Sequence, residues 1–180
     1  MKVEILCTGD EVLSGKVINS NYSFMSSKLE EVGITVIWGT TVGDNKQDLL
    51  DAFKLASERA DAVIVNGGLG PTVDDLSQEV AGIASGNELE LRHDWLEIME
   101  KFFIKRGRAM TENNKKQAML PKGAELINNP IGTACGFAIN INKSRFFFTP
   151  GVPRELFLML EDEIIPRLIE LSGEKFVTRL

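Results

Sequence analysis

Residues 62–72 of the chain read AVIVNGGLGPT, and this stretch is the most informative one about the fold. Its first four residues form an apolar run without proline or charge, which is typical of a buried β-strand. The run leads directly into a loop that contains three glycines, and we expect a helix to begin just after it, near Val73. A strand, a tight loop and a helix in this order are the repeating unit of α/β folds.

The same alternation extends in both directions from this stretch. Further strands are expected at Val3–Cys7, Ile34–Trp38, Glu125–Ile127, Gly136–Ile141 and Arg145–Phe148. Helices are expected from Asn21 to a cap at Gly33, after an N-cap at Asp44 with Gln47, after a capping box of Asp94 and Glu97, from Thr111 through Met119, and from Pro153 through Leu168. This order predicts a mainly parallel sheet with helices on both faces, and the turn Asn142-Lys143-Ser144 adds an antiparallel hairpin.

Length and composition are those of one globular domain. The 180 residues include 43% hydrophobic and 26% charged residues, so a core of ordinary size is expected. We place the domain at residues 1–170 and regard residues 171–180 as the start of a linker or of a further strand. Because Lys175–Leu180 resembles a strand with nothing after it, the sequence suggests a larger protein or a truncated chain.

Charge and cysteine content exclude several classes of protein. The formal net charge is −6 and no basic stripe is present, which argues against duplex nucleic acid as a partner. Cys7 and Cys135 lack the spacing of a zinc site or a disulfide framework. Since no signal peptide and no apolar run of about 20 residues is present, we expect a cytoplasmic protein that makes no contact with membranes.

Three polar loops follow expected strands, and in open α/β sheets ligands bind beyond the carboxyl ends of the strands. These loops are Thr8–Glu11, Gly43–Asn45 and Gly67–Thr72. The glycines of the third loop would let the backbone approach an anion closely, and a following helix would offer free amides. The loop matches neither G-x-G-x-x-G nor a P-loop, and the alternative is a turn that merely needs glycine and proline.

Acidic residues stand next to the glycine loop. Asp74 and Asp75 could bind a divalent cation shared with phosphate oxygens, and Glu11 could supply another carboxylate. The alternatives are favourable charges at a helix start, with Asp75 as a capping partner of Thr72, and solvated loop charges at Asp10 and Glu11. The single histidine, His93, is expected at the surface, and the stripe from Trp95 to Phe103 in the core.

Several segments, in the same order along the chain, resemble the N-terminal domain of the CinA proteins of the competence/damage-inducible type. They are Gly9–Gly15, Ile18–Asn21, Val42–Asn45, Gly67–Asp75, Asn114–Gly123, Gly132–Ala134 and Pro150–Glu155. That domain is similar to the molybdopterin-binding fold of the MoaB and MogA proteins. One departure is mild: Ser77 stands where the family usually has threonine.

The resemblance implies a three-layer α/β/α sandwich and a metal-dependent hydrolysis of the pyrophosphate in ADP-ribose. It also implies kinship with proteins that bind molybdopterin, which MogA adenylylates. CinA proteins usually carry a further C-terminal domain that deamidates nicotinamide mononucleotide. That activity is not expected from this chain alone, although further C-terminal domains of the same protein are a possible partner.

Our first hypothesis is therefore a pyrophosphatase of small nucleotides that uses Mg²⁺ or Co²⁺. The residues expected to bind phosphate are Gly67, Gly68, Gly70, Pro71 and Thr72. Asp75, with Glu11 or Asp74, is expected to bind the metal and to act in catalysis. The residues expected to bind the rest of the substrate are Asp10, Ser14, Asn19, Asn21, Asp44, Asn45, Thr133 and Gly151.

Two other hypotheses remain open. In one, the same loop serves a domain that binds molybdopterin or transfers an adenylyl group. In the other, the domain is a non-catalytic module for oligomerisation or regulation of a larger enzyme. All three are compatible with a homo-oligomer, which we expect because closed symmetric assemblies are common for such domains.

Overall fold

A computed structural model describes residues 1–173 of the chain. Its centre is a six-stranded sheet in the order β2-β1-β3-β8-β7-β6. The first four strands in this order pair in parallel, and β7 joins β8 and β6 through antiparallel pairings. The strands are β1 (Val3–Thr8), β2 (Val36–Val42), β3 (Ala62–Asn66), β6 (Glu125–Ile127), β7 (Gly136–Ile141) and β8 (Ser144–Thr149).

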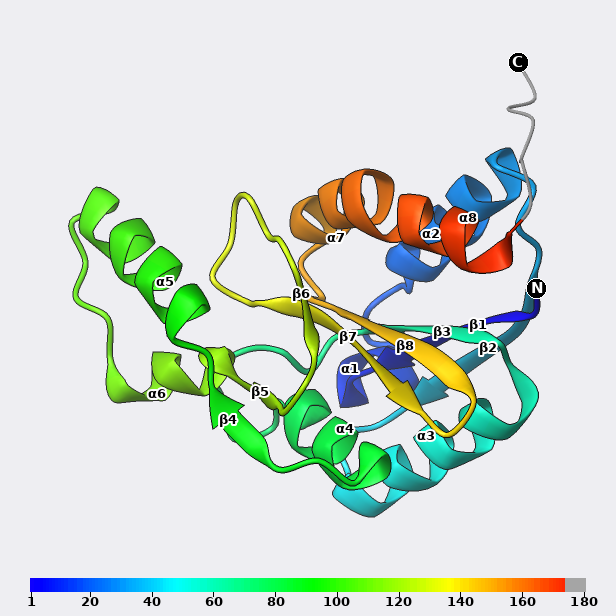
Figure 1. Cartoon of the computed structure of the whole chain (residues 1–180), viewed down its shortest axis with the longest axis horizontal. Coiled ribbons are helices and arrows are strands. Elements are labelled where there is room, and N and C mark those ends of the chain that lie inside the picture. Colours follow the sequence, from blue (N-terminus) through cyan, green and yellow to red (C-terminus); the bar gives the residue numbers. More distant parts are fainter. Residues whose placement is uncertain (174–180) are drawn as a thin grey trace.

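Helices cover both faces of this sheet, so the expected three-layer sandwich is confirmed (Figure 1). One face carries α2 (Ser20–Glu31), α7 (Pro153–Met159), the π-helical turn η2 (Leu160–Ile164) and α8 (Ile165–Ser172). The other face carries α3 (Lys46–Arg59) and α4 (Ser77–Ser85). A short helix, α1 (Asp10–Leu13), follows β1 directly.

The central strands bury alternate residues in two separate cores. In β3, Val63 and Val65 pack toward α3 and α4, whereas Ala62 and Ile64 pack toward α2 and α7. Such a strand has no polar face, because helices cover the sheet on both sides. This is the physical reason why the run before the glycine loop is apolar without interruption.

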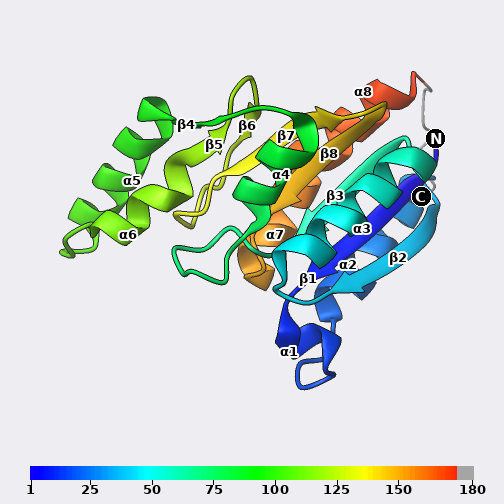
Figure 2. The same ribbon diagram turned by 90° about the horizontal axis from the view of Figure 1, so that it is seen from below.

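An arm, residues 89–121, projects from one end of the sandwich (Figures 1 and 2). It consists of β4 (Leu89–Leu91), α5 (His93–Lys105), α6 (Glu112–Lys115), the 3₁₀ turn η1 (Lys116–Ala118) and β5 (Met119–Pro121). β4 and β5 pair as an antiparallel two-stranded sheet. The base of the arm joins the main core through Trp95, Met99 and Leu120.

Several predicted boundaries are wrong. The helix expected near Val73 begins at Ser77, because Asp75 instead closes a turn with Thr72. The second strand covers Val36–Val42 rather than Ile34–Trp38. Thr111 does form a capping box, with Asn114, but its helix ends at Lys115 and the chain then turns into β5.

Two predicted caps are also wrong. Asn45 rather than Asp44 caps α3, because its side chain accepts hydrogen bonds from the amides of Gln47 and Asp48. Helix α5 begins at His93, and the Asp94 carboxylate binds Arg92 and the Trp95 amide instead of forming a box with Glu97.

Other expectations can be compared directly with the structure. His93 is exposed, as predicted, and Gly33 follows α2 in the left-handed region with φ 83°. The stripe on α5 is core only in part, because Trp95 and Met99 are buried whereas Ile98 is exposed. The final helix, expected to end at Leu168, ends at Ser172, and the strand expected at Lys175–Leu180 lies outside the described residues.

Candidate functional site

A cavity of about 510 Å³ opens at the carboxyl ends of β1 and β3. These strands are parallel neighbours in register, so Cys7 of β1 lies beside Asn66 of β3 and the loops that follow them leave the sheet at the same edge. The segment 17–21 before and within α2, and residues 151–153 before α7, complete the wall. The cavity therefore lies where open α/β sheets bind ligands.

Each glycine of the loop has a steric reason. Gly67 has φ 108°, and a Cβ atom there would lie 2.6 Å from the Thr8 hydroxyl. Gly68 has φ 73°, and its Cβ would collide with the Ser77 side chain. A Cβ on Gly70 would lie 2.5 Å from the Asp75 carboxylate. The tight turn alone thus accounts for all three glycines.

Two backbone amides of the loop, those of Gly67 and Thr72, are already engaged. The Gly67 amide donates to the Thr149 carbonyl at 2.9 Å. The Thr72 amide and hydroxyl both donate to Asp75 Oδ2, at 2.9 and 2.6 Å. Within residues 1–173 the Gly68 and Gly70 amides have no acceptor, and of these two residues only Gly68 lines the cavity. Gly68 is therefore the loop amide that remains available to a ligand there.

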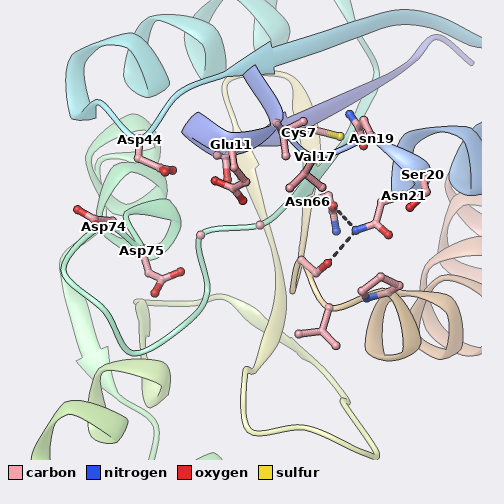
Figure 3. Close-up of a pocket in the computed structure, with 18 of the residues that line it drawn as sticks. Cys7, Glu11, Val17, Asn19, Ser20, Asn21, Asp44, Asn66, Asp74 and Asp75 are labelled. Carbon is pink, nitrogen blue, oxygen red and sulfur yellow. Dashed lines mark hydrogen bonds between the residues drawn. The ribbon is translucent and has the colours of Figure 1, made fainter. Parts of the chain in front are cut away.

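Four carboxylates gather at one end of the cavity (Figure 3). They belong to Glu11 on α1, Asp44 before α3, and Asp74 and Asp75 in the turn before α4. Burial raises the pKa of Asp44, and the charges of Asp10, Glu11 and Asp74 raise it further, while a hydrogen bond from the Asp10 amide opposes this. No described residue that lines the cavity is lysine, arginine or histidine.

The opposite end of the cavity carries amides, a hydroxyl and apolar side chains (Figure 3). Asn21 Nδ2 donates to Asn66 Oδ1 at 3.0 Å and to the Gly151 carbonyl at 2.8 Å, so it ties the two sides of the cavity together. Asn19 caps α2 by accepting from the Tyr22 amide. Ile18 lies at the rim with 88% of its surface exposed.

Two residues that line the cavity each have a buried polar atom without a hydrogen-bond partner. They are the hydroxyl of Thr8 and Oδ1 of Asn21. Thr8 as a whole is only 7% exposed. Because buried polar groups in proteins are almost always satisfied, an unpartnered hydroxyl in a residue that lines the cavity calls for an explanation.

The cysteine in the cavity is not an activated nucleophile. Burial raises the pKa of the Cys7 thiol, and a hydrogen bond with Asn19 offsets this only in part. The thiol therefore stays protonated at neutral pH, whereas nucleophilic cysteines need a thiolate.

The structure brings together most of the predicted site residues. Those that line the cavity are Glu11, Asn19, Asn21, Asp44, Gly67, Gly68, Thr72, Asp74, Asp75 and Gly151. Those that do not line it are Asp10, Ser14, Asn45, Gly70, Pro71 and Thr133.

The second group has other contacts. The Asp10 and Asp44 side chains each accept the backbone amide of the other, at 3.0 and 3.1 Å. Asn45 caps α3, and the Thr133 hydroxyl donates to Gln117 at 3.1 Å. The Ser14 hydroxyl contacts the Glu11 carbonyl at 3.5 Å.

Sequence reasoning placed Thr8 in a loop expected to bind ligand but did not name it as a site residue, and it missed Asn66 and the apolar rim. Thr8 and Asn66 are the last residues of β1 and β3, and a polar residue at the end of an otherwise apolar strand was the signal that could have revealed them. The apolar rim gave no such signal, because exposed apolar residues in loops are common.

No group of three or more His, Cys, Asp or Glu side chains in the described part of the chain is arranged to hold a metal by itself. Carboxylate oxygens are nevertheless suitable ligands for Mg²⁺, which is commonly held by one or two carboxylates plus substrate phosphates.

Comparison with known proteins identifies the family of the chain. Residues 4–170 match the family described as "Probable molybdopterin binding domain". The chain is 51% identical over 170 residues to a CinA-like protein of Escherichia coli. The chain belongs to the molybdopterin-binding domain family, in its CinA-like branch. That alignment covers 94% of the chain but 42% of the Escherichia coli protein, so this CinA-like domain spans less than half of that relative.

Solved structures place the CinA-like domain in the same fold group. The crystal structure of the protein CinA from Thermoplasma acidophilum has a TM-score of 0.80 at 31% identity, covering 95% of this chain and 96% of that one. The molybdopterin biosynthesis enzyme MoaB from Thermus thermophilus has a TM-score of 0.62 at 17% identity, covering 98% and 99%. The latter likeness concerns the fold alone. Among residues 1–173, none of the helices combines the length and apolar character needed to cross a membrane.

Proposed function

We propose that this domain hydrolyses the diphosphate of a small nucleotide such as ADP-ribose, with a divalent metal, Mg²⁺ or Co²⁺. The observation that carries the proposal is the charge pattern of the cavity: four carboxylates and no cationic side chain among the described lining residues. An anionic diphosphate would be repelled there unless a cation accompanied it. A metal–diphosphate complex is thus the ligand that suits the acidic end.

In this proposal the diphosphate lies between the glycine loop and the acidic end. The Gly68 amide and the Thr8 hydroxyl donate to its oxygens, because both lack an acceptor in the described chain. Asp75, with either Glu11 or Asp74, would hold the cation together with phosphate oxygens. Bound there, the metal would neutralise phosphate charge and lower the pKa of a water molecule.

The reaction consumes one water. Its oxygen bonds to one phosphorus as the bridging P–O bond breaks, so ADP-ribose yields AMP and ribose 5-phosphate. Glu11 and Asp74 are suited to accept the water's proton, because no described group hydrogen bonds to either carboxylate. Asp75 is less suited to this role, since its Oδ2 already accepts from Thr72.

The neutral end of the cavity suits the ribose and the ring system. Asn19, Asn21 and Ser20 offer amide and hydroxyl groups, and Asn21 Oδ1 has no partner. Val17, Ile18 and Val152 offer apolar surface to a flat ring. The two ends of the cavity therefore orient an amphiphilic nucleotide in one direction.

The test is hydrolysis of ADP-ribose with Mg²⁺, with Co²⁺ and with EDTA, followed by chromatography of AMP. We expect turnover only with metal. Of the two variants Glu11→Gln and Asp74→Asn, the one that removes the general base should lower kcat by about 100-fold or more. The exposed Asp51→Asn on α3 is the matched control and should leave kcat unchanged. Full activity in both cavity variants would contradict the assignment of the acidic end.

A second candidate is binding of molybdopterin without hydrolysis of a nucleotide. The description of the family that the chain matches supports it. Molybdopterin also joins a ring system to a phosphate, so it suits both ends of the same cavity. Competition between molybdopterin and a non-hydrolysable ADP-ribose analogue separates the candidates, because the true ligand should displace the other at a far lower concentration.

A further inference from the structure

The arm returns to the sandwich with a lysine that contacts the acidic turn. Lys116 lies in η1, and its ammonium donates to the Thr72 carbonyl and to the Asp75 carbonyl, the latter at 2.5 Å. Lys116 follows Thr72 by 44 positions and Asp75 by 41 positions, so both contacts are long-range in the sequence. In the described chain Lys116 forms no ion pair, so its ammonium group hydrogen bonds to these two carbonyls and to no carboxylate.

The next residue extends the same attachment. Gln117 is 3% exposed, and its amide nitrogen lies 3.4 Å from the Leu69 carbonyl. Its amide oxygen accepts from the Thr133 hydroxyl at 3.1 Å. Two consecutive residues of the arm thus reach carbonyls along residues 69–75, which include the loop and the turn.

The turn that carries Asp74 and Asp75 has little support of its own. It lies between the end of β3 and the start of α4 at Ser77, so no sheet or helix ladder holds it. Two backbone hydrogen bonds close this segment, from the Asp75 amide to the Thr72 carbonyl at 3.3 Å and from the Ser77 amide to the Gly68 carbonyl at 3.1 Å. The Asp75 carboxylate closes one side of the turn on Thr72, and Lys116 holds the carbonyls of the same two residues.

We infer that Lys116 is a positioning residue that fixes the carboxylates of Asp74 and Asp75 at the cavity. This inference rests on the proposed function for its effect on catalysis, but not for its effect on the turn. A charged donor forms stronger hydrogen bonds to carbonyls than a neutral one, so a single lysine can hold two. A displacement of about 1 Å in a catalytic group can cost about 100-fold in rate.

The experiment compares Lys116→Met with Lys115→Met. Lys115 is the adjacent lysine, and its ammonium pairs only with the exposed Glu112, so its variant is a matched control. Three quantities are measured in each: kcat and KM for metal-dependent hydrolysis, amide hydrogen exchange of the peptide covering residues 69–76, and Tm. For K116M we expect a fall in kcat of about 10- to 100-fold, a KM within a few-fold of the wild type, and faster exchange at 69–76.

A conservative variant checks the chemistry of the contact. Lys116→Arg keeps a cationic donor and should restore slow exchange at 69–76 and part of kcat, whereas K115M should match the wild type throughout. If K116M does not fold, Lys116→Gln replaces it under the same criteria, since it keeps a polar donor with a shorter reach.

The readouts separate this inference from the proposed function. If the wild type hydrolyses nothing but exchange at 69–76 rises in K116M alone, the positioning role stands and the hydrolase proposal fails. If the wild type hydrolyses ADP-ribose and K116M retains both its kcat and its slow exchange, the inference about Lys116 is overturned while the hydrolase proposal stands.

Discussion

At the scale of single residues, the most telling group is the hydroxyl of Thr8. It is buried in a residue that lines the cavity, and no described atom hydrogen bonds to it. Leaving a buried hydroxyl unpaired costs about 1–3 kcal/mol, so a residue kept for the fold alone would gain by losing it. The Thr8 hydroxyl is thus better explained by a ligand than by packing.

Thr8→Val should therefore separate stability from function. Valine has nearly the same shape, so we expect a Tm equal to or above that of the wild type. The rate of ADP-ribose hydrolysis should fall by about 10-fold, the value of one lost hydrogen bond to a charged group. Thr8→Ser, which keeps the hydroxyl, should retain the rate. A Thr8→Val protein with wild-type rate would contradict the role of this hydroxyl.

The raised pKa of Asp44 predicts how the stability of the domain depends on pH. Burial and neighbouring carboxylates raise its pKa in the folded protein, so the folded state binds this proton more readily than the unfolded state. Stability then falls as the pH rises through the range between the two pKa values. Without metal, Asp44→Asn should have a higher Tm than the wild type at pH 7, and this advantage should vanish below about pH 4. Thermal scans over pH check this, and a lower Tm for the variant at every pH would refute it.

At the scale of elements, the sequence predicted best where burial on both faces left an unbroken apolar run. β3 is of this kind, and β1 is apolar up to Cys7 apart from the buried Glu4. The arm was missed because β4 and β5 have three residues each and only the base of the arm joins the core. The start of α4 was misplaced because the contact of Asp75 with Thr72 suits a helix N-terminus as well as a turn, and only the fold shows that the helix begins later, at Ser77.

The ion pair between Glu4 of β1 and Arg59 of α3 leads to a prediction about stability. Glu4 in β1 is fully buried, and its carboxylate accepts from Arg59 at 2.8 and 2.6 Å and from Thr40 at 2.7 Å. Arg59→Met would leave this charge buried without its partner, which should cost about 3 kcal/mol. That corresponds to a fall in Tm of roughly 6–12 °C for a domain of this size.

The control for this change is Lys54→Met, an exposed position on the same helix. It should shift Tm by little, and neither variant should alter kcat where the protein is folded, because neither residue lines the cavity. An Arg59→Met protein as stable as the wild type would show that the Glu4 charge finds another partner or a proton.

At the scale of the whole molecule, the position of the site was predictable but its composition was only partly so. Three polar loops were expected to meet at one edge of the sheet, and two of them contribute most of the acidic end through Glu11, Asp74 and Asp75. The ligand-facing role of individual backbone amides could be predicted only in part. Asp75 was named beforehand as a capping partner of Thr72, whereas the Gly67 amide is engaged by Thr149, which is distant in the sequence. The neutral end depends on the close approach of α2 and the 151–153 segment, which only the fold brings together.

A whole-molecule consequence is that metal and nucleotide should stabilise the domain jointly. With Mg²⁺ and a methylene-bridged, non-hydrolysable ADP-ribose analogue at about 100 times its Kd, stability should rise by about 2.7 kcal/mol. Thermal scans should show a Tm increase of roughly 5–10 °C, which EDTA should abolish. An equal increase with EDTA present would mean that the ligand binds without a cation.

The most direct test of the central claim uses amide resonances in ¹⁵N-labelled protein. On addition of Mg²⁺ and the same analogue, the account predicts that the largest shifts arise at Gly68 and at the residues around Thr8 and Asp74. If these resonances stay in place while a cluster of amides elsewhere shifts, the cavity at the ends of β1 and β3 is not the nucleotide site.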